Sequence, residues 1–290
     1  MKTTSSQLSN LARRIDFSGA TGETLHQWLH TQWLVTNGLG GYASGTISGA
    51  VTWRYHGLLI AALPAALGPT LLLNHLAEHV RLPDRKITQF GGAEPTQSGE
   101  TESPAYLTEF RLDNQLPTWR YEIDGIIIEK RILMLYLQNT THITYTLKSR
   151  QENVRLELRP SVHFRPFEAN VREVLPDNYQ VRARGQQFEI HSVEDYPCLR
   201  LYIYGDEARF TNDGGSVRKI FYERDAERGY ESRGSLWSPG FFSVPLPVET
   251  PITLIASTED WNTIFALDPE AGLATQRDRR KRLLRNAHPK

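Results

Sequence analysis

The stretch TWRYEIDGIIIEKRILMLY, residues 118–136, decides the fold class. Asp124 and Gly125 stand between two runs rich in β-branched and aromatic residues. An Asp-Gly pair in that setting is a strong sign of a β-hairpin, because both residues tolerate the positive φ angles of a tight turn. We therefore expect strands over residues 118–123 and 126–136, joined at this pair.

Short β-rich runs repeat this strand-and-turn rhythm on both sides of the hairpin. They lie at residues 58–62, 142–147, 154–160, 187–193, 198–204, 217–223, 241–246 and 251–257. Turn residues separate them, as in Asn212 to Gly215 (NDGG). Roughly a dozen short strands at spacings near ten residues indicate a large antiparallel sandwich, and the absence of a longer repeat argues against a propeller.

The segments outside these runs are less regular. Residues 71–82 could form a strand or a short helix, since periodicity does not decide so short a run. Residues 83–105 are rich in Pro, Gly, Ser and Glu, and predict a long surface loop. A short N-terminal helix is expected around Glu23 to His30. We expect a β domain over residues 1–267 and a basic helical linker over 268–290 that leaves the sandwich.

Composition restricts the partners and the compartment. The 33 basic and 33 acidic side chains cancel, so no net field attracts nucleic acid or an anionic membrane. One cysteine, Cys198, forbids an internal disulfide and fits a reducing cytosol. The N-terminus lacks the apolar core of a signal peptide, and no run is long enough for a membrane helix. We expect a cytoplasmic protein without nucleic-acid or membrane partners.

Two histidine patterns raise the question of a metal site. His75, Glu78 and His79 match the H-x-x-E-H pattern of one group of zinc proteases, which requires a helix and a further carboxylate ligand. A strand would place the two histidines on one face and Glu78 on the other. His26 and His30 are also four residues apart, on the expected surface helix. We predict no metal and no cofactor.

Other catalytic patterns fail on context. The run from Gly38 through Gly40 to Ala43 superficially matches the dinucleotide fingerprint, but the following SGTISGAVTW does not form the required helix. No G-x-S-x-G or P-loop pattern is present. Paired carboxylates for glycoside hydrolysis remain open, although nothing in the sequence distinguishes two of the acids. We therefore predict no catalytic residue.

A basic cluster near the C-terminus has two interpretations, RNA binding or a solvated linker helix. Charge balance over the rest of the chain and the lack of an RNA-binding signature favour the solvated helix. The cluster comprises Arg277, Arg279, Arg280, Lys281, Arg282 and Arg285.

The stretch WLVTNGLGGYASGTISGAVTWRYHGLL, residues 33–59, carries the candidate binding residues. Its glycines stand among aromatic residues, and glycines this dense mark positive φ angles or a close approach to the backbone. Its β-branched and aromatic residues favour extended segments joined by glycine turns. The residues indicate a binding loop or a tightly packed turn. The candidates are Asn37, Gly38, Gly40, Gly41, Tyr42, Trp53, Arg54, Tyr55 and His56.

This stretch resembles the signature of the N-terminal domain of bacterial and archaeal glycogen debranching enzymes (amylo-α-1,6-glucosidases). Those proteins carry near-identical runs to Asn37–Tyr42, Gly45–Thr46 and Arg54–Leu59. The resemblance continues through residues 117–136 and 139–147, and spans roughly residues 30–260. Trp53 departs from it, because a more polar residue, often Arg, is expected there.

The resemblance implies a β-supersandwich similar to the domain that precedes the catalytic barrel of bacterial glucoamylases. In such enzymes an (α/α)₆ barrel of several hundred further residues carries the two carboxylates that hydrolyse α-1,6-glucosidic branch linkages. The chain would then be a non-catalytic domain. Its implied partners are an α-glucan, such as glycogen or branched dextrin, and the catalytic barrel in cis or in trans.

Three functions remain open at this point. The candidate residues could recognise a glucan, because aromatic rings suit the apolar C–H faces of a sugar and Asn or Arg suits its polar edges. They could instead serve packing and inter-domain contacts, which would make the chain an interaction module without glucan affinity. A self-contained glycoside hydrolase is the third.

Overall fold

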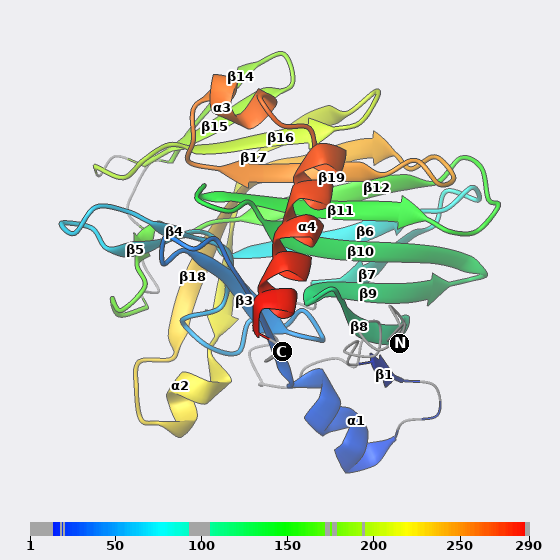
Figure 1. The fold of residues 1–290 in the computed structure, drawn as a ribbon, viewed down its shortest axis with the longest axis horizontal. Helices are drawn as coiled ribbons and strands as arrows, with labels where there is room; N and C mark the ends of the chain where they lie inside the picture. Colours follow the sequence, from blue (N-terminus) through cyan, green and yellow to red (C-terminus); the bar gives the residue numbers. More distant parts are fainter. Residues whose placement is uncertain are drawn as a thin grey trace.

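The computed structural model of the chain describes residues 14–17, 19, 21–92, 105–171, 175, 179–192 and 195–287. Within these residues the chain forms nineteen strands and four helices, and the strands make three antiparallel sheets (Figure 1). The predicted all-β class with antiparallel pairing is confirmed.

The largest sheet has nine strands, in the spatial order β1–β8–β9–β10–β11–β19–β16–β15–β14. Its strands are β1 (Arg14–Asp16), β8 (Leu107–Asp113), β9 (Leu116–Ile123), β10 (Ile126–Met134), β11 (Thr140–Leu147), β14 (Gln180–Arg184), β15 (Gln187–His191), β16 (Leu199–Tyr204) and β19 (Ile252–Ser257).

The two smaller sheets have five strands each, in the orders β17–β18–β12–β6–β7 and β13–β5–β4–β3–β2. The first contains β6 (His75–Arg81), β7 (Ile87–Gly91), β12 (Arg155–Ser161), β17 (Arg209–Phe221) and β18 (Arg233–Pro245). The second contains β2 (Gln32–Thr36), β3 (Tyr42–Thr46), β4 (Gly57–Ala62), β5 (Pro69–Leu73) and β13 (Arg165–Pro166).

The predicted hairpin forms the middle of the large sheet as strands β9 and β10. Ile123 pairs with Ile126, so the loop consists of Asp124 and Gly125 alone. Their φ angles are +48° and +82°, which is the geometry of a type I′ turn. The right-handed twist of that turn matches the twist of the strands, and this match explains why so short a loop suffices.

The main core lies between the large sheet and the sheet of β6, β7 and β12, which Figure 1 shows behind it. Ile128 and Ile132 of β10 and Leu156 and Leu158 of β12 all belong to one buried cluster. Alternate residues of each strand face this layer, because side chains of a strand point to opposite sides in turn. Each fully buried Ile or Leu contributes about 1.5–3 kcal/mol.

The alternation of side chains along β10 also places a charged residue, Lys130, in this core. Lys130 occupies an inward position of β10, and its ammonium group lies 2.7 Å from the fully buried carboxylate of Glu78 on β6. Tyr145 of β11 donates a hydrogen bond to the same carboxylate, and the ammonium group lies 5.1 Å from the centre of the Trp119 ring. These contacts satisfy the charges that burial would otherwise leave unpaired.

Segments that the sequence left open, or assigned to a loop, are strands. Residues 71–82 form no helix: residues 71–73 belong to β5 and residues 75–81 form β6, whereas Asn74 and Leu82 lie outside both strands. The predicted loop at 83–105 is wrong in part, because Ile87–Gly91 pairs with β6 as strand β7. Phe90 supplies the reason, since its buried ring packs 5.1 Å from that of Tyr121. Residues 93–104 of this segment lie outside the described residues.

Two predicted backbone paths differ from the observed ones. Asn212 to Gly215 is not a chain reversal but a bulge inside β17, where the register against β18 shifts. Gly214 and Gly215 have φ angles of +84° and +81°, and such angles accommodate a bulge as readily as a turn. The expected extended path near Trp53 is also wrong, because His56 N–H donates to the Trp53 carbonyl at 2.9 Å and closes a turn.

Four helices accompany the sheets: α1 (Gly22–Leu29), α2 (Glu223–Glu227), α3 (Trp261–Phe265) and α4 (Pro269–Ala287). The first and last confirm the helices predicted at the two ends. The Asp268 side chain accepts a hydrogen bond from Ala271 N–H at 2.8 Å, which makes Asp268 the N-cap of α4. Among the described helices, none combines the length and the apolar composition that a membrane span requires.

Helix α4 lies across the large sheet instead of leaving it (Figure 1). Leu273 packs on a small buried cluster that includes Leu133 and Leu135. Arg277 forms an ion pair with Asp113 at 2.8 Å. The helix thus packs on the sheet through apolar side chains and an ion pair. Helical propensity alone does not predict this packing. The division of the chain at residue 268 stays a prediction.

Candidate functional site

The loop between β2 and β3 is built around the buried side chain of Asn37. Its carbonyl oxygen accepts hydrogen bonds from the N–H groups of Leu39 and Gly41, both at 2.9 Å. Its amide nitrogen donates to the carbonyl of Gln138 at 3.0 Å and to the side-chain oxygen of Asn139 at 2.9 Å. Asn37 therefore shapes the loop and ties it to the connection between β10 and β11, with its polar atoms already engaged.

Two glycines of this loop are required by close contacts. A Cβ atom on Gly38 would stand 2.5 Å from the Tyr136 ring, and the φ angle of Gly38 is +83°. A Cβ atom on Gly41 would stand 2.6 Å from the Asn37 amide nitrogen. The dense glycines of the sequence thus allow the backbone to approach its neighbours, as their pattern predicts.

The Arg54 side chain holds the turn before β4 against α2. Its Nε donates to Asp225 Oδ1 at 2.6 Å, and its backbone N–H donates to Asp225 Oδ2 at 2.8 Å. The two side chains are 7% and 1% exposed. Its terminal nitrogens donate to the Glu231 carbonyl at 3.0 Å and to Asn170 Oδ1 at 3.4 Å. Arg54 is thus bound within the domain by contacts on several sides.

An open cavity of about 700 Å³ lies beside this framework. Seven of the nine predicted residues line it, whereas Asn37 and Arg54 do not: the seven are Gly38, Gly40, Gly41, Tyr42, Trp53, Tyr55 and His56. The structure therefore separates residues that face the cavity from residues that build it. Ligand contact by any of them stays a prediction.

Aromatic rings form one wall of the cavity. The rings of Trp53 and Tyr55 meet edge to face with centroids 4.7 Å apart, and Phe167 lies 5.6 Å from Tyr55. The Tyr55 hydroxyl donates to Glu168 Oε2 at 2.8 Å, and this hydrogen bond raises the pKa of Tyr55. The Tyr42 hydroxyl donates to the Tyr55 carbonyl, and burial raises the pKa of Tyr42 to about 12. Both phenols are therefore neutral near pH 7.

His56 is the only ionisable imidazole among the described lining residues. Burial, with a smaller contribution from Arg224, lowers the pKa of His56 to about 3. Its Nδ1 accepts a hydrogen bond from Thr52 N–H at 3.3 Å, so the proton of the neutral ring is on Nε2. Burial of this neutral ring makes His56 a poor general base near neutral pH.

Sequence reasoning missed seven lining residues; Trp33 and Ser44 lie on β2 and β3 within the signature stretch, and the other five are of two kinds. Gln32, Leu34 and Thr36 alternate with buried residues along β2, and this alternation is a signal that could have been used. Phe167 and Glu168 come from more than a hundred residues further along the chain, next to β13. No local pattern predicts that position, because it follows from the pairing of β13 with β5.

The lining side chains can contact a polar ligand. Glu168 is the only carboxylate among the fourteen described lining residues, whereas glycoside hydrolysis ordinarily uses two. Aromatic faces, phenol hydroxyls and one carboxylate can stack on and hydrogen-bond a polar ligand that has apolar faces.

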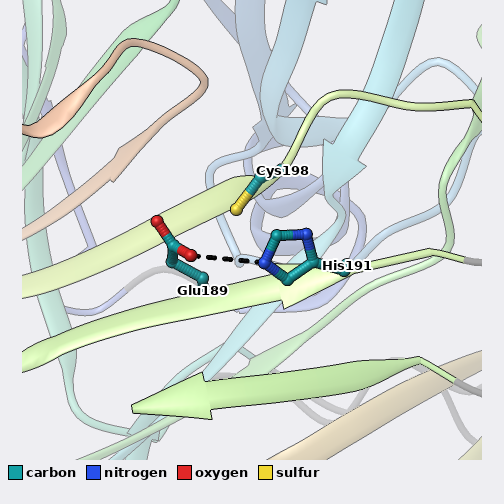
Figure 2. A group of neighbouring side chains, drawn as sticks. All are labelled: Glu189, His191 and Cys198. Atoms are coloured by element: carbon teal, nitrogen blue, oxygen red, sulfur yellow. Dashed lines mark hydrogen bonds and ion pairs between the residues drawn. The ribbon is translucent and has the colours of Figure 1, made fainter. Parts of the chain in front are cut away.

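Metal-ligating side chains occur elsewhere in the structure. His75, Glu78 and His79 lie on strand β6, so the strand alternative for this motif is confirmed and its protease geometry is lost. Glu189, His191 and Cys198 form a separate group outside the cavity, with ligand atoms within 4.8 Å of one another (Figure 2). The two histidine patterns on which the prediction of no metal rested do not include these three residues.

Comparison with known proteins gives a family match. The family model described as "Glycogen debranching enzyme N terminal" matches residues 31–253. No curated protein sequence matches the chain. Among solved structures, a bacterial glucoamylase complexed with acarbose is similar over 91% of this chain, with 9% identity and a TM-score of 0.37. The chain spans 38% of the length of that glucoamylase.

Proposed function

The chain belongs to the glycogen debranching enzyme N-terminal family, and from this premise we propose that it is a non-catalytic domain that binds α-glucan in the cavity beside β2 and β3. The observation that carries the proposal is the aromatic wall of Trp53, Tyr55 and Phe167. The family signature contains Trp53 and Tyr55 of this wall and three glycines that also line the cavity.

The proposed binding mode follows from the chemistry of a glucose unit. Each unit offers apolar C–H faces and a rim of hydroxyl groups, so a ring such as Trp53 would stack on a face. Glu168, at the exposed end of the Tyr55 hydrogen bond, would accept from sugar hydroxyls. The volume of about 700 Å³ falls within the range of ligand-binding pockets.

Calorimetric titration of the whole chain with maltooligosaccharides and branched dextrin tests this function. We expect binding that Trp53→Ala weakens by up to ~10-fold, since stacking of this kind contributes ~0.5–1.5 kcal/mol. Tyr204→Ala is the matched control, because it removes an exposed aromatic side chain from β16, outside the cavity. Absence of heat up to millimolar glucan would remove glucan recognition from the proposal.

A second candidate function, docking of a catalytic (α/α)₆ barrel in cis or in trans, is favoured by the surface next to the cavity. Leu39, Tyr136 and Leu137 are 48%, 44% and 53% exposed. Gly38 contacts Tyr136, and Leu137 N–H donates to the Asn37 carbonyl at 2.7 Å, so the three lie around one loop. Exposed apolar side chains grouped in this way are typical of an interface.

Docking has its own test. We expect a separately produced (α/α)₆ domain of this family to bind the chain, and Leu39→Asp with Leu137→Asp to abolish that complex in sedimentation velocity. Survival of the complex in this double variant would contradict docking through these residues. Release of glucose from branched dextrin by the purified chain alone would overturn the non-catalytic assignment.

A cytoplasmic location of the protein also stays a prediction.

A further inference from the structure

The hairpin of β15 and β16 brings together a carboxylate, an imidazole and a thiol. Glu189 and His191 are two residues apart on β15 and share one face of the strand. Ile190 pairs with Leu199, and continuing this antiparallel register places Cys198 opposite His191. Figure 2 shows the three side chains turned toward one another.

The distances within this group are close to those of a tetrahedral metal site. Zinc lies ~2.0–2.3 Å from N, O and S ligands, so ligand atoms around it are about 3.3–3.7 Å apart. Glu189 Oε2 and His191 Nε2 are hydrogen-bonded to each other at 3.3 Å, a contact that a cation between the two atoms would replace. One ligand atom from each of the three residues falls within 4.8 Å of the others. A shift of about 1 Å in one side chain would complete the geometry.

The remaining oxygen of Glu189 is held in place by two donors. Trp261 Nε1 donates to Oε1 at 2.9 Å, and Arg200 Nε donates to the same oxygen at 3.1 Å. This arrangement leaves Oε2 directed at His191. Ligating carboxylates in metal sites are oriented by hydrogen bonds of this kind. Because Arg200 takes only one oxygen, the carboxylate retains lone pairs for a cation on the other.

A reactive thiol explains the group less well. Cys198 is the only cysteine of the sequence, so it has no partner for an internal disulfide. A thiol that faces a histidine and a carboxylate is better suited to share a cation with them.

We propose that Glu189, His191 and Cys198 bind one thiophilic divalent cation of the Zn²⁺ type. Cys198 would lose its proton to solvent on binding, and His191 would bind through Nε2, with the proton of its neutral ring on Nδ1. Solvent would take the fourth position, because the described residues supply three ligands. The cation would fasten the start of β16 to the end of β15. This inference does not depend on glucan binding.

Titration of the chelator-treated chain with Co²⁺ tests the proposal. We expect one Co²⁺ per chain and a near-ultraviolet thiolate-to-cobalt absorption band, which Zn²⁺ then displaces. Since the chain has a single cysteine, such a band can arise only from Cys198. Cys198→Ser should remove the band, and His191→Ala and Glu189→Gln should each weaken Co²⁺ binding at least ~10-fold.

His26→Ala is the matched control, because it removes an exposed histidine of α1 and should leave the band and the affinity unchanged. Thermal unfolding without metal shows whether each variant is folded, and Zn²⁺ should raise the unfolding temperature of the unsubstituted chain but not of Cys198→Ser. Absence of the band at millimolar Co²⁺ would overturn the proposal. The proposal would also be overturned if both His191→Ala and Glu189→Gln showed the band with unchanged affinity for Co²⁺.

Discussion

Replacing Arg54 by Ala separates a structural role of this signature residue from a ligand-binding one. The substitution removes the 2.6 Å ion pair with Asp225 and the 3.0 Å hydrogen bond to the Glu231 carbonyl. Asp225 is 1% exposed, so its carboxylate would stay buried without a counter-charge. Among the described residues, only the hydrogen bond from the backbone N–H of residue 54, at 2.8 Å, would remain on it.

The size of the effect follows from this burial. Removing one partner of a buried ion pair costs about 3–5 kcal/mol, because the other charge stays desolvated. We therefore expect Arg54→Ala to lower the free energy of unfolding by ~3–5 kcal/mol. Asp225→Ala should cost a similar amount, and the double variant should cost clearly less than the sum, because neither charge is then left alone.

Urea denaturation followed by circular dichroism measures these free energies from the midpoint and the slope. Arg81→Ala is the matched control. Arg81 pairs with Glu157 at the same distance of 2.6 Å, but its side chain is 43% exposed. The control should therefore cost no more than about 1 kcal/mol.

One result would refute the structural interpretation of Arg54. If Arg54→Ala unfolds within ~1 kcal/mol of the unsubstituted chain, as an exposed pair would, the residue does not hold the fold. If glucan binding is lost in the same stable variant, Arg54 contacts the ligand. A stability loss no larger than that of Arg81→Ala would likewise show that Arg54 does not hold the fold.

Three further perturbations have defined outcomes. Lys130→Met should lower the free energy of unfolding by ~3–5 kcal/mol in urea, since it leaves the Glu78 carboxylate buried and unpaired, and adding Glu78→Gln should recover part of the loss; equal stability would contradict a buried pair. Gly38→Ala should cost ~1–3 kcal/mol in the same assay, because its φ is +83° and its Cβ would stand 2.5 Å from the Tyr136 ring; a neutral result would show that the loop yields. Burial lowers the pKa of His56 to about 3, so between pH 6.5 and 3 the unfolded chain binds a proton that the folded chain does not. The free energy of unfolding should therefore fall as pH falls, by about 2 kcal/mol for this group between pH 7 and 5. His56→Asn should remove this part of the measured pH dependence.

Local sequence patterns correctly predicted elements whose formation depends on neighbouring residues. The Asp124–Gly125 turn formed as predicted, because two residues that tolerate positive φ fix the hairpin by themselves. The helices at Gly22–Leu29 and Pro269–Ala287 also formed. Errors arose where one residue type supports two structures. Gly214 and Gly215 suit a bulge as well as a turn, and only pairing with β18 decides between them.

The candidate site was predictable only in part. Seven of the nine residues predicted from the signature stretch line the cavity, because one hairpin and one turn carry them. It gave no means of separating Arg54, which binds Asp225 at a distance of 171 residues along the chain, from residues that face the cavity. Phe167 and Glu168 reach the cavity only through the β13–β5 pairing.

By itself the sequence of this protein determined the all-β class, the main hairpin and membership of the debranching-enzyme N-terminal family. Tertiary structure alone decided that Lys130 enters the core, that α4 lies on the large sheet, and that Glu189, His191 and Cys198 meet. The physical reason is range. Turn and strand preferences act over a few residues, whereas these contacts depend on sheet register and on the packing of layers between distant segments.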